Sequence, residues 1–191
     1  MLNFGLFNER KSAQAAAYLL HMAGGTLPLL KLMKLMYLAE RTSLEKYGET
    51  ITGDGFVSMR HGPVLSTTYE HMNGSLRSCE GGWSSLISDR AEHQLALKDP
   101  STIRDPEQDL LALSETDTEC LKEIWDKFGG MDKWQLVEYT HSGGCPEWED
   151  PGPSMRPIPP ARLLSNVGYS PEAVQALTRR LHEQRYLNAS F

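Results

Sequence analysis

Three side chains of the sequence could together carry out nucleophilic chemistry. Cys145 could supply a thiolate, and His61 or His141 could supply the base that activates it. His141 and Cys145 are four positions apart, but Gly143-Gly144 separates them within a loop rich in glycine and proline. Nothing in the sequence brings His61 to either residue. A thiol- or histidine-dependent hydrolase is therefore an alternative function rather than the leading one.

Metal, cofactor and phosphate chemistry have no matching sequence pattern. The chain has three cysteines and six histidines, but no pair of them has zinc-finger spacing and there is no HExxH sequence. The phosphate-binding sequences GxxxxGK[ST] and GxGxxG do not occur either. We therefore expect no catalytic residues, no metal site and no cofactor.

The charge of the 191-residue chain is unevenly distributed along the sequence. Residues 79–155 contain six Lys or Arg against seventeen Asp or Glu, whereas the segments before and after them are slightly basic. The simplest interpretation of this excess is a solvated surface, and the alternative is an electrostatic attraction for a basic protein partner. The candidate partner-facing residues are Asp105, Glu107, Asp109, Glu119 and Glu123.

Nucleic-acid binding is disfavoured by the net charge of −6. The first two predicted helices, with Gly24-Gly25 between them, could imitate a helix-turn-helix, but the second is too apolar for a recognition helix. A basic cluster near the C-terminus, Arg179 to Arg185, could contact phosphate. An autoregulatory DNA-binding protein therefore stays an alternative function.

The elements that must position these residues are mainly helices. Apolar residues recur at the spacing of one buried helical face from Leu29 to Tyr37, so a helix over 26–47, capped by Thr26, should be central. Pro63 is expected at the first position of another helix, with Val64 and Tyr69 packing on the central one. The other predicted helices span 11–23, 63–72, 115–128, 132–140, 159–164 and 171–186.

Short apolar alternation at 83–90 and 92–98 predicts a small hairpin. Together these patterns predict an α+β fold that is predominantly α-helical. We expect a single compact domain over residues 1–191, with a small β-hairpin or short sheet.

The sequence also favours a cytoplasmic protein that does not engage membranes. The N-terminus lacks the order of a signal peptide, and no apolar run approaches the roughly 18–20 residues that span a bilayer. The three cysteines are far apart and odd in number, which does not suit a disulfide framework.

Three stretches resemble one known family in their order and spacing: KLMKLMYLA, RHGPV and the late loop THSGGCPEW. They are similar to the Panacea antitoxin-domain family, also described as SocA-like or GepA-like phage-associated bacterial proteins. The resemblance covers about residues 13–177, and the late loop departs from the family pattern because Glu147 stands between proline and tryptophan. The motif residues are Lys31, Lys34, Tyr37, Arg60, His61, Gly62, Pro63, Val64, Tyr69, His141, Pro146 and Trp148.

The resemblance implies an antitoxin, which is not an enzyme and which binds and neutralises a protein toxin encoded by a neighbouring gene. One branch of the family looks like a proteolytic adaptor that delivers the bound toxin to an ATP-dependent protease, so this mechanism stays an alternative. The motif residues would either hold the fold together or contact the partner. Family members pair with unrelated toxins, so the resemblance does not imply which toxin is bound.

Overall fold

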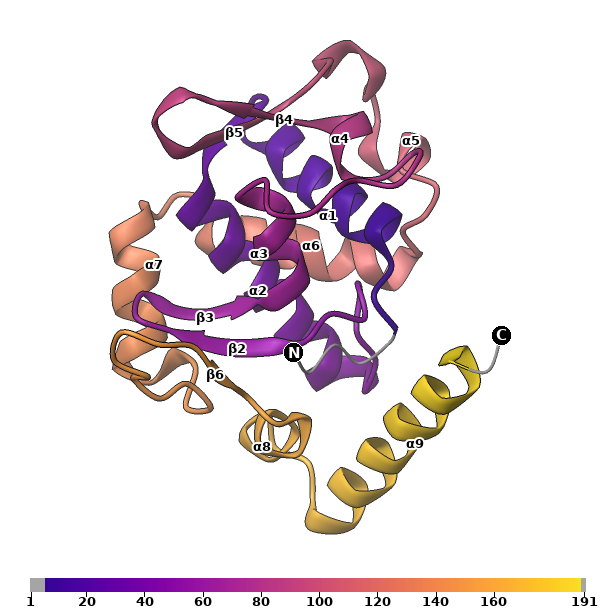
Figure 1. Cartoon of the computed structure of the whole chain (residues 1–191), viewed down its shortest axis with the longest axis vertical. Coiled ribbons are helices and arrows are strands. Elements are labelled where there is room, and N and C mark those ends of the chain that lie inside the picture. Colours follow the sequence, from indigo (N-terminus) through magenta and orange to yellow (C-terminus); the bar gives the residue numbers. More distant parts are fainter. Residues whose placement is uncertain (1–5, 190–191) are drawn as a thin grey trace.

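The computed structural model describes residues 6–189, apart from the side chains of residues 89–91 and 188–189 (Figure 1). Helices pack around α2 (Leu29–Tyr47), and two small antiparallel sheets complete the fold. The predicted α+β class, predominantly helical, is confirmed. The first sheet has the strand order β1-β5-β4, formed by Thr26–Pro28, Gln94–Leu97 and Ile87–Arg90; the second has the order β3-β2-β6, formed by Gly62–Leu65, Phe56–Met59 and Arg156–Pro157.

The central helix is confirmed, but its beginning differs from the prediction. Thr26 does not cap α2, because its backbone pairs with Ala96 in the first sheet and the helix starts only at Leu29. Gly48 ends the helix in the left-handed conformation, with φ 65°, as its position after the last apolar residue predicts. Helix α2 is buried along most of its length, with α1, α6, α7 and β3 packed around it.

The prediction that Pro63 opens a helix is wrong. Pro63 lies in β3, where it faces Ser58 of β2, and the helix that follows, α3 (Ser66–Met72), begins three residues later. Strand β3 is at the edge of its sheet, a position where the missing amide hydrogen of proline is tolerated. Asp54 binds the start of α3 instead: its carboxylate accepts hydrogen bonds from the backbone amides of Thr67 at 2.9 Å and Thr68 at 2.7 Å.

The predicted hairpin is confirmed by the antiparallel pairing of β4 with β5. Its first four predicted residues form a helical turn instead, α4 (Trp83–Leu86). Strand β5 also pairs with β1, so the hairpin becomes part of a sheet at the top of the view in Figure 1.

The later helices follow their predicted start signals. Ser114 and Asp117 form a capping box at α6 (Glu115–Phe128), and Asp132 and Gln135 form another at α7 (Lys133–Tyr139). The remaining helical elements are α1 (Glu9–Met22), α5 (Pro106–Asp109), α8 (Pro160–Asn166), α9 (Pro171–Ala189) and the short turns Ala91–His93, Pro100–Thr102 and Thr140–Gly144.

Helix α9 projects from the rest of the molecule (yellow in Figure 1). It packs on α8, its Leu177 contacts Gly48, and its Arg180 forms an ion pair with Glu49. Beside these contacts, α9 and residues 48–53 line a groove of about 400 Å³.

Candidate functional site

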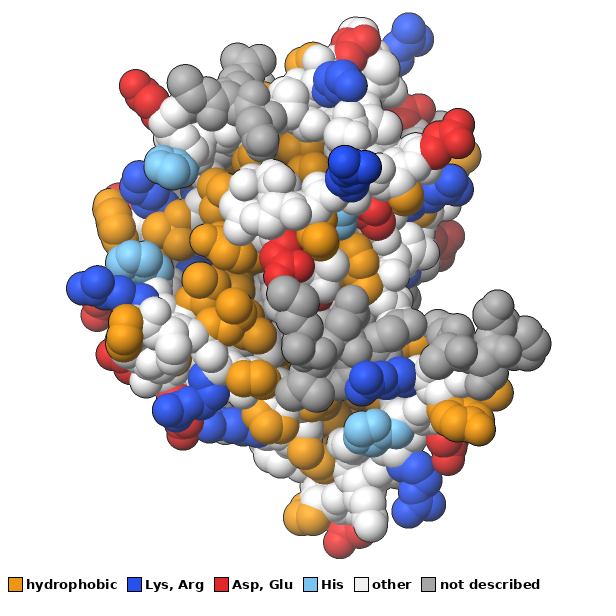
Figure 2. Space-filling model, in the orientation of Figure 1, with side chains coloured by type: hydrophobic (Ala, Val, Ile, Leu, Met, Phe, Trp, Pro, Cys, Tyr) orange, Lys and Arg blue, Asp and Glu red, His pale blue; other side chains and the backbone are white. Residues whose placement is uncertain are grey.

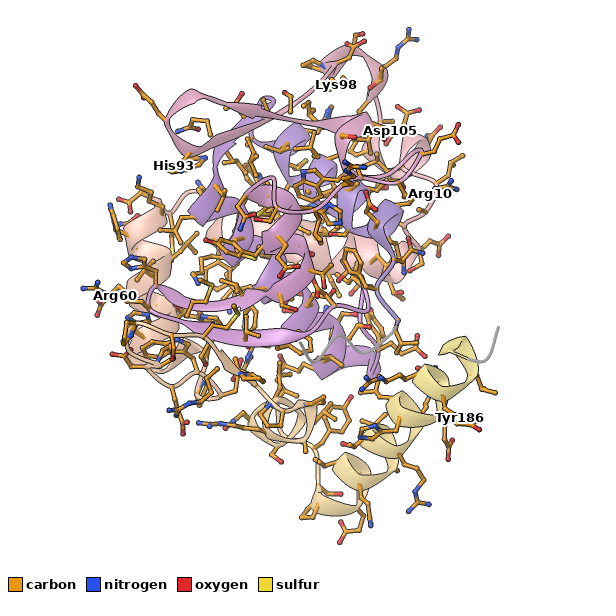
Figure 3. The ribbon with its side chains drawn as sticks, in the orientation of Figure 1. Arg10, Arg60, His93, Lys98, Asp105 and Tyr186 are labelled. Carbon is orange, nitrogen blue, oxygen red and sulfur yellow. The ribbon has the colours of Figure 1, made fainter. Side chains whose placement is uncertain are left out.

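Motif residues that are far apart in the sequence meet beside α2. We call the side chains of Lys34, Tyr37, Arg41, Cys145 and Glu147 the buried base, and those of Arg60, His61, Trp134, His141 and Trp148 above it the aromatic edge. Hydrogen bonds from Lys34 to Pro63, and from Tyr37 and Arg41 to Glu147, join α2 to the β2–β3 turn and to the late loop after α7. Figure 3 shows Arg60 at the rim of the molecule, at the end of the β2–β3 turn.

Lys34 locks the β2–β3 turn onto the central helix. Its side chain is fully buried, and its Nζ donates a hydrogen bond to the carbonyl oxygen of Pro63 at 2.6 Å. Burial lowers the pKa of Lys34 to about 7. Gly62 fits beneath it without a side chain: its φ is +100°, and a Cβ would lie 2.6 Å from Thr140 Oγ1 and 2.8 Å from Lys34 Nζ. A side chain at Gly62 would therefore collide with the residues that hold this turn.

Tyr37 and Arg41 hold the late loop through Glu147. The Tyr37 hydroxyl donates to Glu147 Oε1 at 2.8 Å, and Arg41 Nε donates to the same oxygen at 3.1 Å. Both Tyr37 and Glu147 are buried, and burial, followed by the Glu147 charge, raises the pKa of Tyr37 well above its ordinary value. The residue by which this loop departs from the family pattern is thus the one that ties it to α2.

Cys145 lies in the same buried base and is not poised as a nucleophile. Burial and then the Glu147 carboxylate raise the pKa of its thiol to about 12. A nucleophilic cysteine needs the opposite shift, because the reactive species is the thiolate. The two histidines considered with it have ring partners of their own: His61 faces Trp134, and His141 stacks on Trp148.

The aromatic edge is formed by two pairs of rings. His141 and Trp148 are nearly parallel, with ring centroids 4.0 Å apart, and Trp148 Nε1 donates to the carbonyl oxygen of Met59 at 2.9 Å. His61 meets Trp134 edge to face, with centroids 5.8 Å apart. Partial burial, followed by the Lys34 charge, lowers the pKa of His141, which favours its neutral form. Trp134 is 56% exposed.

The other motif residues have packing roles or stand in solvent. Lys31 donates to the carbonyl oxygen of Gly129, just after α6, at 2.7 Å, and its ammonium lies 5.8 Å from the centre of the Trp125 ring. Val64 is buried, Tyr69 is half-buried against the core, and Pro146 is exposed.

The candidate acidic residues lie elsewhere, on α5, on α6 and in the adjoining loop. Lys46 Nζ is 2.9 Å from Glu119 and 2.5 Å from Glu123, and the Tyr47 hydroxyl donates to Glu119 at 2.7 Å. Figure 3 shows Asp105, at the start of α5, on the opposite side of the view from Arg60.

Two of these acidic residues also bind backbone amides. Asp105 caps α5 by accepting the amide of Glu107 at 3.1 Å. Asp109 accepts the amides of Arg104 and Asp105 at 2.8 and 3.0 Å, and these bonds lower its pKa. All five candidates are nevertheless exposed, so their charges face solvent.

Sequence reasoning missed Arg41, Thr140 and Trp134 and did not assign a role to Glu147. Arg41 could have been found, because it stands four residues after Tyr37 on the same helical face. The signal for Glu147 was its unexpected place in the late loop. Within the described part of the chain, no group of three or more His, Cys, Asp or Glu side chains could hold a metal ion, and no helix is long and apolar enough to cross a membrane.

Comparison with protein families matches residues 32–149 to the family described as "Antitoxin SocA-like, Panacea domain". This match spans more than half of the chain and contains the whole buried base and aromatic edge. Comparisons with curated proteins and with solved structures gave no significant match. The family resemblance of the sequence motifs is therefore confirmed: the chain belongs to the SocA-like antitoxin family that carries the Panacea domain.

Proposed function

We propose that this protein is an antitoxin that neutralises a protein toxin, encoded by a neighbouring gene, by binding the toxin directly and covering its working surface. The family match over residues 32–149 is the observation that carries the proposal. We further propose that the protein acts by binding and not by catalysis. The buried thiol of Cys145 supports this second point, because its raised pKa disfavours the thiolate that a nucleophilic cysteine needs.

The acidic residues Asp105, Glu107, Asp109, Glu119 and Glu123 have a supporting role in this proposal. Their exposed charges would attract a basic toxin over several ångströms and raise the rate of encounter. Lys46 and Tyr47 keep Glu119 and Glu123 in place, but these contacts leave the net charge of the surface negative.

Co-expression with the neighbouring gene tests the proposed function. The protein should restore growth of cells that express the toxin, and the two should co-purify as a complex. Cys145→Ser is the matched control, since a binding protein should keep full rescue with this small buried change, whereas a thiol enzyme would lose it. Absence of both rescue and complex with the unaltered protein would overturn the proposal.

The half-life of the toxin separates direct occlusion from delivery to a protease. Under our proposal, the toxin is inactive but as long-lived with the antitoxin as without it. A toxin half-life that shortens only when the antitoxin and an ATP-dependent protease are both present would replace occlusion with the adaptor mechanism.

A further inference from the structure

The aromatic edge leaves large interaction groups exposed on one small surface. Trp134 is 56% exposed, and Arg60, His61 and His141 are exposed beside it or on the neighbouring loop. Tryptophan and arginine are the residue types that most often dominate the binding energy of protein interfaces. Figure 2 shows basic, acidic and hydrophobic side chains close together on the left of the view.

The edge is also held rigidly from below. Trp148 is bonded to the carbonyl oxygen of Met59, and the preceding residue, Glu147, is bonded to α2. The β2–β3 turn that carries Arg60 and His61 is fixed by Lys34 through Pro63. A preorganised surface loses little conformational entropy when a partner binds, so its contacts contribute more fully to affinity.

Two cations at the edge, Arg60 and Lys133, can bind a partner carboxylate, and the edge also carries the negative charges of Asp132 near Lys133 and of Glu138 and Asp150 near His141. No carboxylate of the described residues lies within 4 Å of the Arg60 guanidinium or of Lys133 Nζ, which sits 5.6 Å from the centre of the Trp134 ring. The nearby Asp132 accepts the amides of Trp134 and Gln135 at the start of α7.

A hollow of about 310 Å³ opens between Arg60 and the turn at residues 150–153, where a partner side chain can enter. On the far wall of this hollow, the carboxylate of Asp150 accepts the amide of Gly152 at 2.8 Å. Among the described residues Arg60 has no ion-pair partner, so it can bind an incoming carboxylate, while Asp150 keeps its negative charge on the opposite wall.

We propose that the aromatic edge is the docking site for a protein segment that places a carboxylate near Arg60 and Lys133 and a large apolar side chain against Trp134. The segment belongs to the toxin partner, so this inference rests on the proposed function and assigns its interface. A single nucleic-acid strand is the less fitting occupant, because His141 already covers one face of Trp148 and so removes a ring face on which a base could stack.

The experiment compares two edge variants with two matched controls, using the product of the neighbouring gene as the binding probe. Trp134→Ala and Arg60→Glu should each weaken binding at least about tenfold, as loss of a central interface residue does. Leu111→Ala removes an 85% exposed apolar side chain near α5, and Arg179→Glu reverses an exposed charge on α9; both should bind within about twofold of the unaltered protein.

Folding of every variant is checked by its thermal unfolding curve. Trp134 is well exposed, and it takes part in the helix cap only through its backbone amide, which donates to the Asp132 carboxylate, so truncation of its side chain should leave the fold intact. His61→Ala serves as a third edge variant if Arg60→Glu proves unstable.

The outcomes separate the interface from the function. Equal binding by folded edge variants and controls would overturn the docking site while leaving the antitoxin function standing. Failure of the unaltered protein to bind the probe would overturn the proposed function and this inference with it. Tight binding of a single-stranded oligonucleotide that Trp134→Ala abolishes, with toxin binding unchanged, would replace the protein segment by a nucleic acid.

Discussion

The acidic surface around α5 and α6 and the aromatic edge beside α7 differ in how their polar groups are used. On the acidic surface, the carboxylates of Glu119, Glu123 and Asp109 all have partners within the chain. Beneath the aromatic edge the polar groups of the buried base are hydrogen-bonded within the chain, whereas the edge residues Arg60, His61, Trp134 and His141 are exposed. A large excess of charge therefore does not by itself mark the surface that offers the most contact energy to a partner.

The two regions also differ in how much the fold depends on them. Glu147 in the buried base joins Tyr37 and Arg41 of α2 to a loop more than a hundred positions away. The exposed acidic side chains differ, because water can replace their ion pairs and hydrogen bonds at little cost in stability. Substitutions in the two regions measure this difference.

Glu147→Ala should have the largest effect on stability. The change leaves the Tyr37 hydroxyl without its acceptor and the Arg41 guanidinium, which is 17% exposed, without its nearest carboxylate. We expect the free energy of unfolding to fall by about 3 kcal/mol, measured by urea denaturation. Glu123→Ala on the acidic surface is the control and should leave the unfolding midpoint almost unchanged. Similar losses for the two variants would show that the base is no more important to the fold than the acidic surface.

The pH dependence of stability should reveal Lys34. Its pKa is about 7 in the folded protein and near 10.5 in the unfolded chain, so between these values the unfolded state binds a proton that the folded state does not. Stability contributed in this way increases as pH rises from 7 to about 10, with a slope approaching about 1.4 kcal/mol per pH unit. Below pH 7 both states are protonated and the slope disappears.

Lys34→Met should remove that increase, measured as the difference between the two stability curves. The difference is needed because Cys120 and Cys145 have raised pKa values and contribute in the opposite direction above about pH 9. The carboxylates of Asp109 and Glu119 have lowered pKa values and do not titrate in this window. Parallel curves for the variant and the unaltered protein would contradict the lowered pKa of Lys34.

Lys31→Met tests the link between α2 and the C-terminal end of α6. Lys31 bonds the carbonyl oxygen of Gly129 at 2.7 Å, where the negative end of the α6 dipole favours a cation. Since methionine keeps the apolar stem but not the charge, we expect a loss of about 1 kcal/mol in thermal or urea unfolding. An unchanged stability would mean that water replaces this cap without cost.

The sequence predicted helices well where the signals are local. The capping residues before α6 and α7 and the glycine after α2 are all adjacent to the elements they limit, and these boundaries were found. Pro63 was misplaced because proline suits both the first turn of a helix and an edge strand, and only the pairing with β2 decides between them.

The candidate site could be predicted only as a set of residues, not as an arrangement. Glu40, Asp54 and Glu147 look like solvated carboxylates in the sequence, yet all three are buried and bonded to groups 11 to 110 positions away. Burial of a carboxylate depends on donors that other elements bring to it, which no local pattern encodes. The same reason explains why Trp134 was not associated with His61.

The double variant Glu119→Gln and Glu123→Gln should have the smallest effect, and only on kinetics. Both side chains are exposed, so the unfolding midpoint should not move measurably. The association rate with the toxin should fall several-fold at low salt and converge with that of the unaltered protein at high salt, because ions screen attraction between exposed charges. The dissociation rate should stay the same if the contacts lie at the aromatic edge. A faster dissociation with an unchanged association rate would instead place these carboxylates inside the interface. The acidic surface would then contact the toxin directly and would not act only by attracting it.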